Sequence, residues 1–355
     1  MTGLGGFVFP GIQTRVVFGR GTLASVGEEL LALGHESALV LSTPHQLNQA
    51  EAVAGHLGKA AAGLFTQAAM HTPVDVTESA IEAFRKSGAT CVVGIGGGST
   101  VGLAKAIATR TGADQIVIPT TYAGSEMTDI LGETTDGEKT TRRDASIRPE
   151  VVIYDVDLTL SLPVDMTVTS ALNAIAHGIE GLYAADANPI TDMMALDAMR
   201  AFKDALPDVV RDMNDAEARS KVLYGAWLCS TALGYVSMAL HHKLCHVLGG
   251  SFGLPHADTH AIMLPHTAGF NAVAVPDKLA PVAEIFGGSV GGGLWDFAKA
   301  HGAPLRLADL GFSADDLDRA AEIATRNPYD NPRAFDRSDI RDLLEAAWEG
   351  TRPDN

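Results

Sequence analysis

Cysteines are scarce in this sequence, and the three that are present lie far apart. Cys91, Cys229 and Cys245 lack the paired spacing of a disulfide framework or a zinc ribbon, so we expect reduced thiols. No apolar run reaches membrane-spanning length, and the first residues, MTGLGGFVFPG, lack the basic stretch of a secretory signal. These absences predict a cytoplasmic protein.

Positive charge is also in short supply. The chain has 26 Lys and Arg residues against 43 Asp and Glu residues, which gives a formal net charge of −17. A surface of this sign repels nucleic acid and anionic lipid. We therefore expect no nucleic-acid partner and no membrane partner.

The 355 residues are too many for one ordinary core, and the two halves differ in pattern. Short β-branched runs at 37–43, 89–96, 115–121 and 150–155 alternate with helical patterns. This alternation predicts a Rossmann-like parallel sheet with helices on both faces. Later runs are rich in Ala, Leu and Met. We predict an α/β dinucleotide-binding domain at 1–160 and an all-α catalytic domain at 161–355.

Two polar turns follow predicted strands, and parallel strands bring such turns to one sheet edge. GIGGGST, at 94–100, opens a helical pattern, so its glycines allow a phosphate to approach the helix start. PTTYAGSEMT, at 119–128, adds hydroxyl groups. A plain strand-to-helix turn with capping hydroxyls is the alternative. The predicted cofactor contacts are Gly96, Gly97, Gly98, Ser99, Thr120, Thr121, Ser125 and Thr128.

The first predicted strand ends in Ser42-Thr43-Pro44, with no acidic residue to hold a ribose 2′-hydroxyl. We therefore expect both NADH and NADPH to serve, with Thr43 and Pro44 lining the adenosine end. Lys139 is a further candidate for cofactor contact. It shares with Arg142 and Arg143 a predicted connection between the domains, where the three cations either reach an anionic substrate or form a solvated loop.

Six of the twelve histidines fall between residues 241 and 266. His242 and His246 share one helix face by their spacing, with His241 and Lys243 to either side, and Gly249-Gly250 is expected to end that helix. Asn173 and His177 are also four apart, on a helix predicted at 169–184 with Thr169 or Ser170 as its cap. His256, His260 and His266 follow in the next segment.

Together these motifs resemble the iron-containing alcohol dehydrogenase and dehydroquinate synthase superfamily. The resemblance rests on GIGGGS, the PTT turn, the polar residue four before a histidine, and a histidine followed fourteen residues later by Pro255-His256. It implies a dehydroquinate synthase-like fold and a metal held by Asp and His on one helix and by two further His. The matching positions are Asn173, His177, His242 and His256.

Asn173 departs from that pattern, because a neutral amide replaces the only anionic ligand. With HHKLCHVLGG and PTTYAGSEMT, this departure is similar to the maleylacetate reductase branch. That resemblance implies NADH- or NADPH-dependent reduction of the carbon–carbon double bond of maleylacetate to 3-oxoadipate during aromatic-compound breakdown. It also implies no required metal and favours a homodimer.

A metal-free site needs side chains that handle the charge formed on an enolate. His242 and His246 are the candidate oxyanion donor and proton source, His177 and His256 position the substrate, and Lys243 is the nearest cation. Which histidine gives the proton stays open. The alternatives are a metal-dependent alcohol dehydrogenase with Asn173 as an amide-oxygen ligand, a lyase of the dehydroquinate synthase type, and a non-catalytic metal-binding protein.

Overall fold

The computed structural model describes residues 6–135, 138–327 and 329–355, which divide into two compact units. The α/β unit contains Ile12–Leu162 and Asn214–Leu223. The helical unit contains Pro163–Met213 and Tyr224–Asn355, together with the described residues before Ile12. The unit changes at Leu162, beside the predicted boundary at 160. No helix in the described ranges is long and apolar enough to cross a membrane.

The predicted boundary at 160 assigns two segments to the wrong unit. Residues 6–11 belong to the helical unit, where the Phe9 ring lies 5.0 Å from the ring of Tyr235. Asn214–Leu223 belongs to the α/β unit because the buried Arg219 donates a hydrogen bond to the Leu162 carbonyl (2.9 Å). Both links are side-chain contacts between distant parts of the chain, which periodicity does not reveal.

The α/β unit is built on a parallel sheet with strand order β1-β8-β5-β4-β2-β3. This sheet confirms the predicted fold class. The four predicted strands correspond to β2, β4, β5 and β8, whereas β1 and β3, at the two edges, were not predicted. The bounds are β1 Arg15–Gly19, β2 Ala38–Leu41, β3 Ala61–Phe65, β4 Cys91–Gly96, β5 Asp114–Pro119 and β8 Val151–Asp155.

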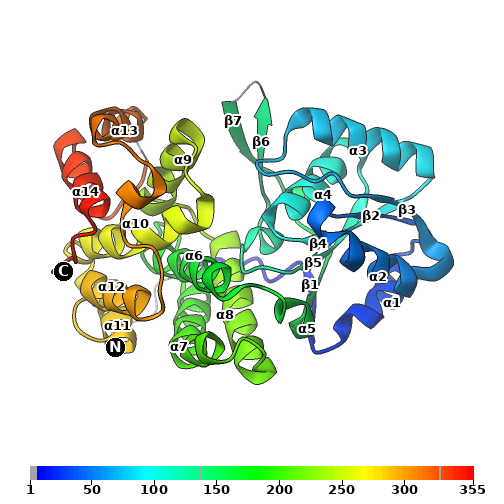
Figure 1. The fold of residues 1–355 in the computed structure, drawn as a ribbon, viewed down its shortest axis with the longest axis horizontal. Helices are drawn as coiled ribbons and strands as arrows, with labels where there is room; N and C mark the ends of the chain where they lie inside the picture. The colour runs from blue at the N-terminus through cyan, green and yellow to red at the C-terminus, as the bar shows by residue number, and fades with distance from the viewer. Residues whose placement is uncertain (1–5, 136–137, 328) are drawn as a thin grey trace. The chain divides into compact units, whose positions relative to one another are not determined.

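Helices cover both faces of this sheet (Figure 1). Helices α1 (Val26–Ala32) and α2 (Leu47–Leu57) share a core with every second residue of the central strands, including Val93 and Ile95. The opposite face carries α3 (Val74–Ser87) and α4 (Gly98–Thr111). Helix α4 packs on β4 at Gly94, where an added Cβ would be in van der Waals contact with the Ala104 side chain at 3.4 Å.

The segment predicted to connect the domains forms an antiparallel hairpin within the α/β unit. Strand β6 (Ile130–Thr135) pairs with β7 (Glu138–Arg143), and Ile130 is opposite Arg143. The prediction of a connection between the domains was wrong, because the Thr and charged residues of this segment pair with one another as a two-stranded ribbon inside the α/β unit. The short helix α5 (Val156–Thr159) follows β8.

The helical unit contains the nearly all-buried helix α6, which packs against α7 and α10. Helix α6 begins earlier than predicted, with Pro163 as its N-cap. Thr169 and Ser170, the predicted caps, lie inside the helix, where their hydroxyl groups donate hydrogen bonds to carbonyls of the preceding turn. Helix α9 does not end at Gly249-Gly250 but at Phe252, before Gly253 in the left-handed region. The helices that lie wholly or partly in this unit are α6 Val164–Tyr183, α7 Pro189–Arg211, α8 Ala216–Gly234, α9 Leu240–Phe252, α10 His256–Ala272, α11 Pro276–Phe286, α12 Val290–Ala300, α13 Leu317–Thr325 and α14 Arg337–Glu349.

Candidate active site

The glycine turn lies at the carboxyl edge of the sheet, between β4 and α4. Gly96 ends the strand, Gly97 is the N-cap, and Gly98 and Ser99 begin the helix. A Cβ at Gly97 would lie 3.1 Å from the Thr121 hydroxyl, and the Thr120 N–H donates to the Gly96 carbonyl (3.0 Å). The turn and the threonines after β5 therefore meet, as predicted. Small residues and a helix start together form a cradle that fits a phosphate group.

Ser125 and Thr128 have a different environment from the one expected of cofactor ligands. Both hydroxyl groups contact the ammonium of Lys105, at 3.3 and 3.0 Å. Lys105 lies on α4 and is fully buried. Burial lowers the pKa of this ammonium to about 7, against the opposing attraction of Glu126 and Asp129. These two hydroxyls thus hold the loop after β5 to α4. Lys105 was not among the predicted site residues.

The end of β2 is also tied into the sheet edge. Thr43 donates a hydrogen bond to the Gln46 side chain (3.0 Å), and Pro44 begins a short 3-10 helix, Pro44–Gln46. Gln46 in turn donates to the Thr120 hydroxyl (2.9 Å). Sequence reasoning singled out Thr43, Pro44 and Thr120 but missed Gln46, which links two of them.

Two of the predicted basic residues of the hairpin, Arg142 and Arg143, are engaged in ion pairs. Arg142 lies 3.3 Å from Glu133, and Arg143 lies 3.0 Å from Asp129. Lys139 lies in β7, and its side chain lies outside the described residues. The pairs with Glu133 and Asp129 give Arg142 and Arg143 partners within the α/β unit, and the contact of either arginine with an anionic substrate stays a prediction.

Six histidines form a connected cluster in the helical unit. His177 comes from α6, His241, His242 and His246 from α9, and His256 and His260 from α10. The His242 ring stacks on His177 at 5.1 Å and lies 5.2 Å from His260 and 6.1 Å from His246. His256 contacts His260 at 4.3 Å. The predicted convergence of three segments is present, with Asn173 also buried on α6.

Glu180, on α6, is the site residue that sequence reasoning missed. Its side chain is fully buried, and its Oε2 accepts a short hydrogen bond from His242 Nδ1. Its Oε1 accepts from the backbone N–H of His241 (2.9 Å). Burial opposes ionisation of Glu180, but His242 outweighs this effect and leaves the pKa of the carboxyl below its ordinary value. A signal was available, since Glu180 is the only charged residue between Asp165 and Asp186.

The buried histidines around this pair favour their neutral forms. Burial, with the neighbouring imidazoles, lowers the pKa of His177 and of His260 well below the ordinary range. Burial likewise lowers the pKa of His241 to about 3. The Glu180 carboxylate contacts Nδ1 of His242. Among the described residues, His242 is therefore the buried histidine of this cluster that has a carboxylate partner.

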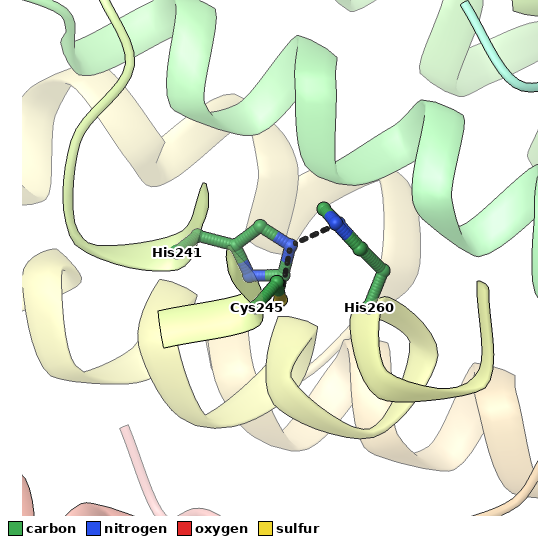
Figure 2. Close-up of side chains that lie close together, drawn as sticks. All are labelled: His241, Cys245 and His260. Carbon is green, nitrogen blue, oxygen red and sulfur yellow. Dashed lines mark hydrogen bonds between the residues drawn. The ribbon is translucent and has the colours of Figure 1, made fainter. Parts of the chain in front are cut away.

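Figure 2 shows His241, Cys245 and His260, whose possible metal-ligating atoms lie within 4.8 Å of one another. The Thr267 hydroxyl donates its hydrogen to the Met263 carbonyl, so it must accept a hydrogen bond from His241 Nδ1. His241 Nε2 then carries no hydrogen and accepts from His260 Nδ1 (2.9 Å). Burial also raises the pKa of the Cys245 thiol well above its ordinary value. This trio is therefore a hydrogen-bonded packing group in the present arrangement.

The four positions that match the superfamily's metal ligands carry one asparagine and three histidines. His177 and His242 stack with their ring centres 5.1 Å apart, and Asn173, buried on the same helix as His177, supplies only a neutral amide. The buried carboxylate of Glu180 is directed at His242 Nδ1. Four neutral donors do not fit the charge-compensated iron site that the resemblance implies.

Comparison with known proteins places these features in a family. The family model for iron-containing alcohol dehydrogenase matches residues 13–156, and the C-terminal model of the Fe-containing alcohol dehydrogenase family matches residues 167–348. Maleylacetate reductase from Rhizobium sp. (strain MTP-10005) is 58% identical over 98% of this chain and 99% of its own. The chain belongs to the maleylacetate reductases of the iron-containing alcohol dehydrogenase family.

Other maleylacetate reductases agree along the whole chain. Maleylacetate reductase 1 from Rhodococcus opacus is 50% identical over 98% of each chain. The crystal structure of maleylacetate reductase from Agrobacterium tumefaciens, 58% identical, covers 99% of this chain and 100% of its own with a TM-score of 0.96. The predicted superfamily and fold are thereby confirmed.

Proposed function

We propose that this maleylacetate reductase family member is itself an NADH- or NADPH-dependent oxidoreductase that reduces the carbon–carbon double bond of maleylacetate to 3-oxoadipate. The reaction would serve the breakdown of aromatic compounds. The observation that carries the proposal is 58% identity to a maleylacetate reductase along 98% of the chain. The buried Glu180–His242 pair within the histidine cluster supports it chemically.

The reaction determines what the protein must supply. NADH or NADPH, held at the glycine turn, would supply a hydride to the alkene carbon β to the ketone. The electron pair of the double bond then moves toward the ketone oxygen as an enolate, and a proton must reach the neighbouring carbon. The side chains therefore have to stabilise an oxyanion and deliver one proton, in a site that keeps water away.

We assign the central role to His242. Its Nδ1 is hydrogen-bonded to the Glu180 carboxylate, which holds the ring in place beside a negative charge. Its Nε2 is buried and has no hydrogen-bond partner among the described residues. An N–H at that position could donate to the enolate oxygen or give its proton to carbon. His246 is the second candidate for these two tasks, because its ring lies 6.1 Å from that of His242.

The remaining cluster residues fit positioning roles. His177 stacks on His242, and the exposed His256 contacts the buried His260, so they would define two sides of the substrate. Lys243, whose ammonium lies 5.8 Å from the centre of the Tyr329 ring, is the candidate partner for a substrate carboxylate. Asn173 would contribute an amide rather than a metal ligand. The dicarboxylate substrate needs such local groups, because the net charge of −17 opposes its approach.

We further propose that catalysis needs no metal ion. The support is the donor chemistry of the cluster, in which the anionic ligand position carries Asn173. The cofactor would bind at the glycine turn, with Gly96, Gly97, Gly98 and Ser99 around the pyrophosphate and Thr43, Pro44, Thr120 and Thr121 beside it. The absence of an acidic residue at the end of β2 favours use of both NADH and NADPH.

A cytoplasmic homodimer without nucleic-acid or membrane partners completes the proposal. A reaction that consumes NADH or NADPH fits that compartment, and the family resemblance favours the dimer. Sedimentation velocity at several protein concentrations tests the second part. A single species at the mass of one chain would contradict it.

A spectrophotometric assay tests the function directly. Purified protein is mixed with NADH and maleylacetate, before and after exhaustive chelation, and the metal content is measured in parallel. We expect NADH oxidation at the same rate in both samples. No turnover of maleylacetate would refute the function. Activity that vanishes on chelation and returns with iron or zinc would refute the metal-independent mechanism and favour the metal-dependent alternative.

A further inference from the structure

We propose that Gln46 is a positioning residue for the dinucleotide, an inference that rests on the proposed use of NADH or NADPH. Gln46 is the last residue of the 3-10 helix Pro44–Gln46 and the N-cap of α2. Both ends of its carboxamide are hydrogen-bonded. Nε2 donates to the Thr120 hydroxyl (2.9 Å), and Oε1 accepts from the Thr43 hydroxyl (3.0 Å). The side chain thereby joins the segment after β2 to the segment after β5.

This connection crosses the end of the strand that carries the glycine turn. In the sheet, β4 lies between β5 and β2, and its last residue is Gly96. A Cβ at Gly96 would lie 2.5 Å from Gln46 Oε1, so the carboxamide rests against the Gly96 backbone. On the other side, the Gly96 carbonyl accepts the Thr120 N–H (3.0 Å). Gln46 and Thr120 together fix where the turn leaves the strand.

The position of this turn decides how a phosphate meets the helix. Gly97 and Gly98 follow at once, and the backbone N–H groups at the start of α4 are the natural donors to a pyrophosphate. A displaced Gly96 would redirect those donors. A glutamine also joins the strand ends without adding negative charge beside the phosphates, as a carboxylate at this position would. Gln46 therefore acts on cofactor affinity through the geometry and the charge of the sheet edge.

The test compares Gln46→Ala and Gln46→Glu with Asn48→Ala, a control at an exposed position of α2. NADH and NADPH dissociation constants are measured by nucleotide fluorescence on the free protein, and kcat and the KM for maleylacetate are measured at saturating NADH. For Gln46→Ala we expect an NADH Kd about tenfold higher, the effect of losing one to two hydrogen bonds. We expect kcat and the KM for maleylacetate within twofold of wild type.

Gln46→Glu separates charge from geometry and serves if the alanine variant does not fold. Its carboxylate can accept from both threonine hydroxyls, so we expect a wild-type melting temperature. We expect the Kd of NADPH to rise more than that of NADH, and the difference to shrink at high salt.

Unchanged Kd values in both variants would overturn the proposal, as would equal losses in kcat and NADH affinity. A wild-type protein that binds NADH but does not turn over maleylacetate would refute the proposed function alone, because the binding measurements need no substrate.

Discussion

Replacing Glu180 by glutamine is the sharpest test of the proposed chemistry. The substitution keeps the size of a fully buried side chain and can still accept the His241 N–H, but it removes the negative charge beside His242. Two unit charges about 4 Å apart at an effective dielectric of about 20 attract by about 4 kcal/mol. Since each 1.36 kcal/mol of barrier corresponds to about tenfold in rate, the attraction sets an upper limit of about 10³-fold.

We therefore expect kcat of Glu180→Gln to fall by about 10²- to 10³-fold, in line with the effect of losing one oxyanion donor in other enzymes. The Kd for NADH should stay within twofold, because the glycine turn is untouched. Stopped-flow measurement of a single turnover reports the chemical step, and fluorescence titration reports the binding of NADH. Glu284→Gln, an exposed site on α11 of the same unit, is the matched control.

The outcome that would refute this reasoning is a Glu180→Gln variant whose single-turnover rate is within threefold of wild type. A variant that binds less NADH and melts at a lower temperature would indicate a structural role instead. Circular dichroism and thermal melting of both variants separate that case from a catalytic loss.

Three further predictions use other residues. His242→Ala should lower kcat by about 10² or more, with NADH affinity nearly unchanged, and an equal loss in both quantities would show that His242 is misplaced in the mechanism. Asn173→Asp should increase iron or zinc uptake, measured by plasma mass spectrometry against Asn48→Asp, and a variant that still excludes both metals would contradict the ligand position. Burial lowers the pKa of His266 to about 4, below that of the unfolded chain, so the unfolded state binds more protons and stability should fall as the pH drops from about 6.5 to 4. The loss should approach about 3 kcal/mol, and urea unfolding of wild type and His266→Gln at pH 7, 5.5 and 4.5 checks whether the variant is less sensitive to acid.

The interior of the sheet could be predicted from the sequence, whereas its edges could not. Strands β4, β5 and β8 are buried on both faces, so they read as short runs of Val and Ile. The edge strand β3 reads AAGLF and is only partly buried. This segment forms a strand because it pairs with β2, and its composition alone does not indicate a strand.

The site shows the same division between local and tertiary information. Helical spacing placed Asn173, His177, His242 and His246 correctly on their helices, because a period of 3.6 residues is a local property. The inward direction of Ser125 depends on Lys105, twenty residues away on another element. Glu180 was missed because a lone carboxylate on a helix is usually solvated, and only its position in an otherwise uncharged run distinguishes it.

The ammonium of Lys105 constrains the length of the loop that follows β5, because it binds several carbonyls of that loop at once. It donates to the carbonyls of Ser125, Thr128 and Ile130 at 2.5, 2.8 and 2.9 Å. Three acceptors spread over six residues thus converge on one nitrogen. Inserting or deleting a single residue between Ser125 and Ile130 would turn at least one carbonyl away and leave part of a buried cation unsatisfied. This loop should therefore tolerate changes of side chain far better than changes of length.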